Sequence, residues 1–138
     1  MEKRIDEKIN EIERYLEELE SITLPTLEDY KADFKTKAAC ERYAERIIEA
    51  IVDLAFLIIK ENNLKSPESD TETFEILADN EIISEELSNK LQDAKGMRNI
   101  LAHEYGEVDD SIIFHAIDEE LIKDVREFIN NIIKYAKT

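Results

Sequence analysis

Glycine and proline, the residues that most often mark turns, are scarce in this chain of 138 residues, which contains two of each. An all-β fold of this size needs many tight turns, and these two residues supply most of them. Their scarcity therefore favours a few long helices. The length is also close to the usual size of one domain, so we expect residues 1–138 to form a single helical domain.

The first half of the chain predicts two long amphipathic helices. Five apolar residues near the N-terminus recur at spacings of three or four and so share one helical face: Ile5, Ile9, Ile12, Leu16 and Leu19. Pro25 ends this helix, and Thr26 followed by Asp29 offers a capping sequence at which the chain turns and restarts. A second long helix is expected from Phe34 to Asn62, with its middle in the core.

The second half predicts a loop, a short helix and two further long helices. Residues 62–69 form the clearest loop, and residues 71–79 can make a short helix. Ser84 can cap a long helix that runs toward Leu101 and that Gly106 stops. A last helix starts at residues 109–111 and buries one face: Ile113, Ile117, Leu121, Val125, Phe128, Ile129, Ile132 and Ala136. The predicted fold is all-α, an antiparallel bundle of four long helices plus a possible short fifth helix.

The charge balance limits the binding partners, since 18 basic and 34 acidic residues give a net charge of −16. This excess opposes binding by bulk attraction to phosphates, so an RNA substrate must be held locally. A basic partner surface explains the acidity equally well, and highly charged surfaces also occur in heat-adapted proteins.

Several functional classes find no support in the sequence. The longest near-apolar run, residues 50–59, is interrupted by Asp53 and is too short to cross a bilayer, so we expect a cytoplasmic protein without membrane contact. The lone Cys40 excludes an intrachain disulfide and suits a buried structural role. With His103 and His115 as the only histidines, we expect neither a metal site nor a cofactor, and we interpret His115 as helix surface or core edge.

One segment concentrates chemically active side chains, namely residues 98–105, with the sequence RNILAHEY. At about 100° per residue, Asn99 and His103 share one helical face, and Arg98 and Tyr105 share another beside it. A guanidinium, an amide, an imidazole and a phenol can therefore converge on one site near a helix end.

RNILAHEY matches the R-x4-H-x-Y form of the motif that characterises the HEPN superfamily, and the chain resembles its HepT-like branch in length, helical layout and motif position. The resemblance implies metal-independent RNA cleavage by a homodimer whose two motifs meet in a cleft. Such cleavage needs a base, an acid and positive charge, and each chain supplies one motif histidine. We assign His103 as base or acid and Arg98 as the phosphate ligand, while Asn99 orients His103 or donates to the substrate.

The same resemblance implies a partner. HepT-like toxins of type VII-like toxin–antitoxin pairs are silenced by MntA-like nucleotidyltransferases, which add AMP to the motif tyrosine. In this chain that tyrosine is Tyr105. A larger assembly of the dimer with the antitoxin is a further possibility that the resemblance leaves open. A bulky anionic nucleotide two residues from His103 would fill the cleft and repel the RNA phosphate.

Each of these residues also has a structural interpretation. Arg98 can pair with a surface carboxylate, His103 can be favoured by the helix dipole, Asn99 can be a surface amide, and Tyr105 can lie at the core edge. The main alternative function is a non-catalytic nucleotide-binding or partner-binding bundle that docks a basic nucleotidyltransferase. A purely structural dimer is a third hypothesis.

A polar stripe on the second long helix adds one further candidate group. Arg46 and Asp53 lie seven residues apart on the same side, together with Arg42 and Glu49. We favour a solvated or dimer-lining row of ion pairs over a direct catalytic role for Arg46 and Asp53.

Overall fold

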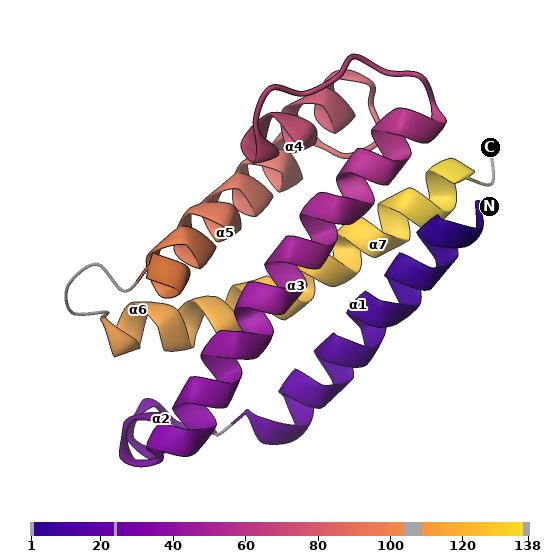
Figure 1. The fold of residues 1–138 in the computed structure, drawn as a ribbon. Coiled ribbons are helices and arrows are strands. Elements are labelled where there is room, and N and C mark those ends of the chain that lie inside the picture. The colour runs from indigo at the N-terminus through magenta and orange to yellow at the C-terminus, as the bar shows by residue number, and fades with distance from the viewer. Residues whose placement is uncertain (1, 24, 104–108, 137–138) are drawn as a thin grey trace.

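A computed structural model describes residues 2–23, 25–103 and 109–136, and within these ranges it contains helices and no strands. The elements are α1 (Lys3–Ile22), α2 (Leu27–Ala32), α3 (Phe34–Glu61), α4 (Asp70–Asp79), α5 (Glu85–His103), α6 (Asp110–His115), the π-helical turn η1 (Ala116–Leu121) and α7 (Ile122–Ala136). Successive long helices run in opposite directions, and the two ends of the chain lie near each other (Figure 1). The predicted antiparallel all-α bundle is confirmed.

Side-chain caps start the helices where the sequence predicts them. The Thr26 hydroxyl accepts a hydrogen bond from the Asp29 amide at 3.1 Å, and the Ser84 hydroxyl accepts one from the Leu87 amide at 3.0 Å. Each bond satisfies an amide that the first helical turn leaves unpaired. The restart at Thr26 opens α2, so within the described residues the bundle has two short helices, α2 and α4, rather than the one that we expected.

The core forms around α3, which lies between its neighbours in the bundle (Figure 1). All five apolar residues predicted for the face of α1 are at most 5% exposed, and Cys40 is buried as expected, with burial raising the pKa of its thiol to about 11. Phe128 of α7 meets Phe74 of α4 edge to face, with ring centroids 5.9 Å apart. Phe114 of α6 packs against Tyr30 of α2, with ring centroids 5.2 Å apart. The prediction that Ala136 is buried is wrong, because this last residue of α7 is exposed at the end of the bundle.

The last long helix contains a π-helical turn, η1, between α6 and α7. Ile113, Ile117, Leu121 and Val125 are all buried, and they follow one another at four-residue steps. In an α-helix, three such steps would leave the last side chain about 120° out of line with the first. The wider π-turn takes up this difference, so that both halves of the helix face the core.

Candidate active site

The motif lies in the C-terminal half of α5. Arg98 and Asn99 belong to its last turns, and the backbone of His103 forms its last residue. The His103 side chain, Tyr105 and the predicted helix stop Gly106 lie outside what the structure describes. The described part of the motif therefore lies in the C-terminal half of α5, and its geometry can be built from Arg98 and Asn99.

Arg98 is held by a carboxylate from another helix. Its Nη2 donates a hydrogen bond to the carboxylate of Glu49, which comes from the middle of α3. The Arg98 side chain is 23% exposed, and its Nε is buried without a hydrogen-bond partner within the described residues. A guanidinium has five N–H donors in a fixed plane, so Glu49 orients the group and leaves other donors for an anion such as a phosphate.

Asn99 is exposed, and it is tied to a second cation. Its Oδ1 accepts a hydrogen bond from Lys95 Nζ at 3.1 Å, one helical turn earlier. Lys95 also pairs with Asp70 of α4 at 3.3 Å, and only 12% of its side chain is exposed. Lys95 was not predicted from the sequence, although its four-residue spacing from Asn99 places both residues on one helical face.

The polar stripe on α3 divides between two neighbouring helices. Glu49 pairs with Arg98 of α5, whereas Asp53 pairs with Lys8 of α1 at 3.6 Å. Arg42 pairs with Glu45 on its own helix at 3.0 Å. Among the residues that the structure describes, Arg46 has no carboxylate within ion-pair distance. The expected ion pairs therefore exist for Glu49 and Asp53, and Arg46 stands apart from them.

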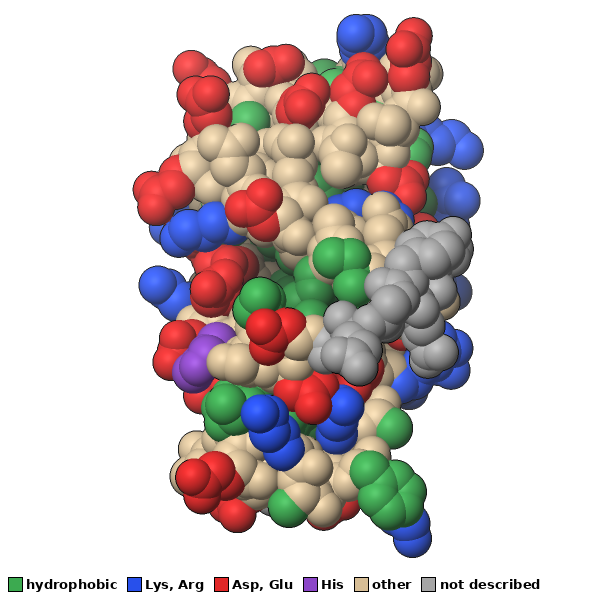
Figure 2. All heavy atoms as spheres, turned by 90° about the vertical axis from the view of Figure 1, so that its left-hand side faces the viewer, with side chains coloured by type: hydrophobic (Ala, Val, Ile, Leu, Met, Phe, Trp, Pro, Cys, Tyr) green, Lys and Arg blue, Asp and Glu red, His purple; other side chains and the backbone are tan. Residues whose placement is uncertain are grey.

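The surroundings of the site carry mostly negative charge. On the face shown in Figure 2, red acidic side chains gather at the upper end and continue into the middle, and blue basic side chains lie at both edges and in the lower middle. His115, the last residue of α6, is exposed, and its Nδ1 lies 3.5 Å from a Glu119 carboxylate oxygen, as expected for a surface residue. Arg98 and Lys95 are thus local cations in an acidic setting.

Two classes of site are not found in the described part of the chain. No helix there is long and apolar enough to cross a bilayer. No group of three or more His, Cys, Asp and Glu side chains in the same residues could hold a metal ion.

Comparisons with known proteins identify the family. The family model for "Ribonuclease HepT-like" matches residues 12–132. The "mRNA nuclease HepT" of Shewanella oneidensis is 33% identical over 73% of this chain and 75% of its own length. The "tRNA nuclease HepT" of Aphanizomenon flos-aquae is 33% identical over 82% of this chain and 77% of its own length.

A solved structure shows the same arrangement of helices. It contains a tri-AMPylated Shewanella oneidensis HEPN toxin in complex with its MNT antitoxin, and the toxin superposes with a TM-score of 0.90 at 29% identity over 97% of this chain and 99% of that chain. The family model and the fold agree. The chain therefore belongs to the HepT-like ribonuclease family of HEPN toxins.

Proposed function

We propose that this chain is the toxin of a type VII-like toxin–antitoxin pair, a metal-independent endoribonuclease that acts on RNA in the cytoplasm as a homodimer. In this proposal residues 1–138 form one domain with one motif, and an MntA-like nucleotidyltransferase silences it by adding AMP to Tyr105. The observation that carries the proposal is the Arg98 guanidinium, which Glu49 holds at the surface five residues before His103.

Each motif residue has a distinct task in this proposal. An imidazole takes the proton from a ribose 2′-hydroxyl, whose oxygen attacks the adjacent phosphorus, and a second imidazole gives a proton to the leaving 5′-oxygen. His103 of each subunit supplies these two groups, which is why a dimer is needed. Arg98 stabilises the negative charge that grows on the phosphorane oxygens. Asn99, together with Lys95, supports this end of α5 and orients His103 or the substrate.

The relatives support the choice of substrate and partner. Two curated relatives are named as nucleases of mRNA and of tRNA, which supports RNA as the substrate class. The structural neighbour is AMPylated and bound to its antitoxin, which supports a nucleotidyltransferase partner for this chain. Two dimers can also assemble with that partner, and the mass of the purified complex would show whether they do.

The decisive experiment compares the two histidines on purified protein and single-stranded RNA. His103→Ala should lower the cleavage rate about 10²- to 10⁴-fold, because the proton transfers lose their donor and acceptor. His115→Ala is the matched control and should keep full activity, since His115 lies at the surface beside Glu119. Helical circular dichroism should be the same for both. Full activity of His103→Ala would remove His103 from the mechanism, and no cleavage by the natural chain would favour the non-catalytic binding bundle that the net charge of −16 also suits.

The modification is tested by intact-protein mass spectrometry after co-expression with a minimal nucleotidyltransferase. The natural chain should gain mass in whole AMP units and lose its ribonuclease activity, because the added phosphate repels RNA. Tyr105→Phe should gain no mass, whereas the control Tyr135→Phe should behave like the natural chain. AMP additions that persist in Tyr105→Phe would place the modification on another residue.

A further inference from the structure

A groove between α1 and α3 collects half of the arginines of the chain. Arg14 lines it from α1, and Arg42 and Arg46 line it from α3, together with Tyr15 and Tyr43. The whole chain contains six arginines and carries a net charge of −16. We call this surface the arginine groove. Such a local excess of guanidinium groups is unexpected on an acidic protein.

The guanidinium groups in the groove are only partly neutralised. Arg14 lies 3.5 Å from a Glu18 carboxylate oxygen, but 64% of its side chain is exposed. Arg42 pairs with Glu45 at 3.0 Å and is 59% exposed. Arg46 is exposed and has no ion pair within the described residues. Exposed pairs contribute little energy, so these cations remain available to an incoming anion.

The tyrosines give the groove a fixed wall. The rings of Tyr15 and Tyr43 meet edge to face with centroids 6.3 Å apart, and the Arg14 guanidinium lies 5.2 Å from the centre of the Tyr15 ring. The Tyr43 hydroxyl donates a hydrogen bond to Glu18 at 2.6 Å. Glu18 is therefore engaged by both Tyr43 and Arg14, and as the one carboxylate among the described residues that line the groove it offsets one of the three guanidinium charges.

The groove leads toward the motif. Arg46 and Glu49 are three residues apart on α3 and so lie on the same face, and Glu49 binds Arg98 of α5. Arg42 lies one further turn along the same face, away from the motif. The two arginines that α3 contributes to the groove therefore lie on the same side of α3 as the carboxylate that binds Arg98, and Arg14 lies beside them on α1.

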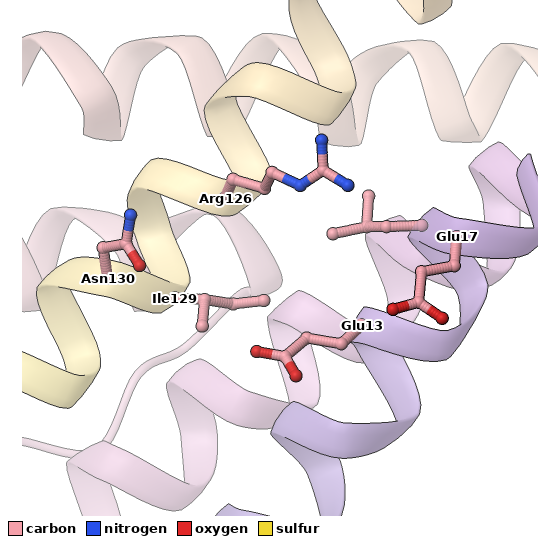
Figure 3. A pocket seen from close by; sticks show the side chains of 6 residues that line it. Glu13, Glu17, Arg126, Ile129 and Asn130 are labelled. Atoms are coloured by element: carbon pink, nitrogen blue, oxygen red, sulfur yellow. The ribbon is translucent and has the colours of Figure 1, made fainter. Parts of the chain in front are cut away.

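A second groove, between α1 and α7, shows what a purely structural arginine looks like. Arg126 reaches from α7 toward α1, where Glu13 and Glu17 line the opposite wall (Figure 3). Both Nη atoms of Arg126 donate to the carboxylate of Glu20, and this bond raises the pKa of Arg126. Carboxylates outnumber cations in this groove, so an anion finds no net attraction there.

We propose that the arginine groove binds the phosphate backbone of the RNA strand beside the cleavage site. The proposal rests on the proposed function for the identity of the substrate. It also answers the difficulty that the net charge raises, because a strand held by Arg42 and Arg46 is gripped locally while the rest of the surface repels nucleic acid. Arg14 and the tyrosine wall then limit the path of the strand.

The test measures RNA affinity in the full chain carrying His103→Ala, so that binding is read without cleavage. A labelled single-stranded RNA that can span the motif and the groove is titrated by fluorescence anisotropy at several salt concentrations. The double variant Arg42→Ala/Arg46→Ala is compared with Arg4→Ala/Arg126→Ala, which removes the same charge elsewhere.

The groove variant should bind about tenfold more weakly. The slope of log affinity against log salt should fall in magnitude by about 1.4, because each phosphate contact contributes about 0.7. The control should change neither quantity beyond a small uniform effect.

Other outcomes overturn the proposal in recognisable ways. Equal losses in both double variants would mean that only the net charge matters. An AMP probe that depends on Arg42 and Arg46 as strongly as RNA does would indicate a mononucleotide site. Loss of the dimer mass, or of co-purification with a nucleotidyltransferase while RNA affinity is kept, would make the groove a protein interface. Absence of cleavage by the natural chain with groove-dependent RNA binding would refute the proposed nuclease activity and leave the groove proposal standing.

Discussion

Helices α3 and α5 cross the same bundle, but they use their residues differently. Eleven of the 28 residues of α3 are buried, and they form the centre of the core. In the described part of α5, four residues are buried, Leu87, Ser88, Leu91 and Leu101, and Leu101 is the one in its C-terminal half. The half of α5 that carries the motif thus has one buried residue among those described, with Met97 partly buried against the core. Helix α3 thus supplies the rigid support, whereas α5 carries the proposed catalytic residues on a half with little buried surface.

The contrast predicts that the same substitution will have unequal effects on the two helices. Ile51→Ala on α3 should lower the free energy of unfolding by about 3 kcal/mol, because Ile51 is 0% exposed and its loss leaves a cavity. Ile100→Ala on α5 is the matched control and should cost less than about 1 kcal/mol, since Ile100 is 50% exposed. Urea denaturation measures both. Equal losses would show that α5 is as deeply buried as α3, for instance by a second copy of the chain.

A second prediction concerns the ion pair that joins the two helices. Glu49→Gln should lower the RNA cleavage rate about tenfold, about 1.4 kcal/mol in the barrier, because Arg98 loses the charged partner that orients it. Glu49→Asp should restore part of the rate, and the effect should fall on kcat more than on KM. Asp53→Asn is the control, since Asp53 lies on the same stripe but pairs with α1. A faster Glu49→Gln enzyme would instead mean that Glu49 holds Arg98 back from the substrate.

The smallest expected effect on stability comes from Asp124, a buried carboxyl on the side of α7 that faces α5. Asp124 is 7% exposed, and burial raises the pKa of its carboxyl, although Lys90 of α5 opposes this shift. The folded state therefore binds the proton more tightly than the unfolded state, so this residue lowers stability as the pH rises above its unfolded pKa of about 3.9. Asp124→Asn should raise the free energy of unfolding at pH 7 by less than about 1 kcal/mol.

The pH dependence identifies the cause of that gain. The stabilisation by Asp124→Asn should vanish at pH values below the unfolded pKa, where the natural carboxyl is protonated in both states. Asp118→Asn removes an exposed carboxylate from the neighbouring turn and should change stability little at either pH. Denaturation curves at neutral and acid pH measure both variants. A gain that persists unchanged in acid would point to a cause other than the charge of Asp124, such as better packing of the asparagine side chain.

The sequence predicted the features that depend on neighbouring residues. Caps at Thr26 and Ser84 and the apolar face of α1 are local patterns, and all of them hold. The partner of Arg98 could not be found in this way, because Glu49 is 49 residues away and only tertiary packing brings it close. The arginine groove escaped for the same reason, since Arg14 comes from a different helix than Arg42. The places of Tyr105 and of the His103 side chain remain predictions.

The π-turn η1 also determines where the chain can change its length. A residue removed from an ordinary α-helical stretch rotates everything beyond it by about 100°, which would separate either Phe114 from Tyr30 or Phe128 from Phe74. Within η1 the extra residue is already absorbed by the wider turn. Removing one exposed residue there, such as Glu119, converts the turn to an α-helix and leaves both aromatic pairs in register. The loss of a single residue at η1 should therefore leave both halves of this helix packed against the core.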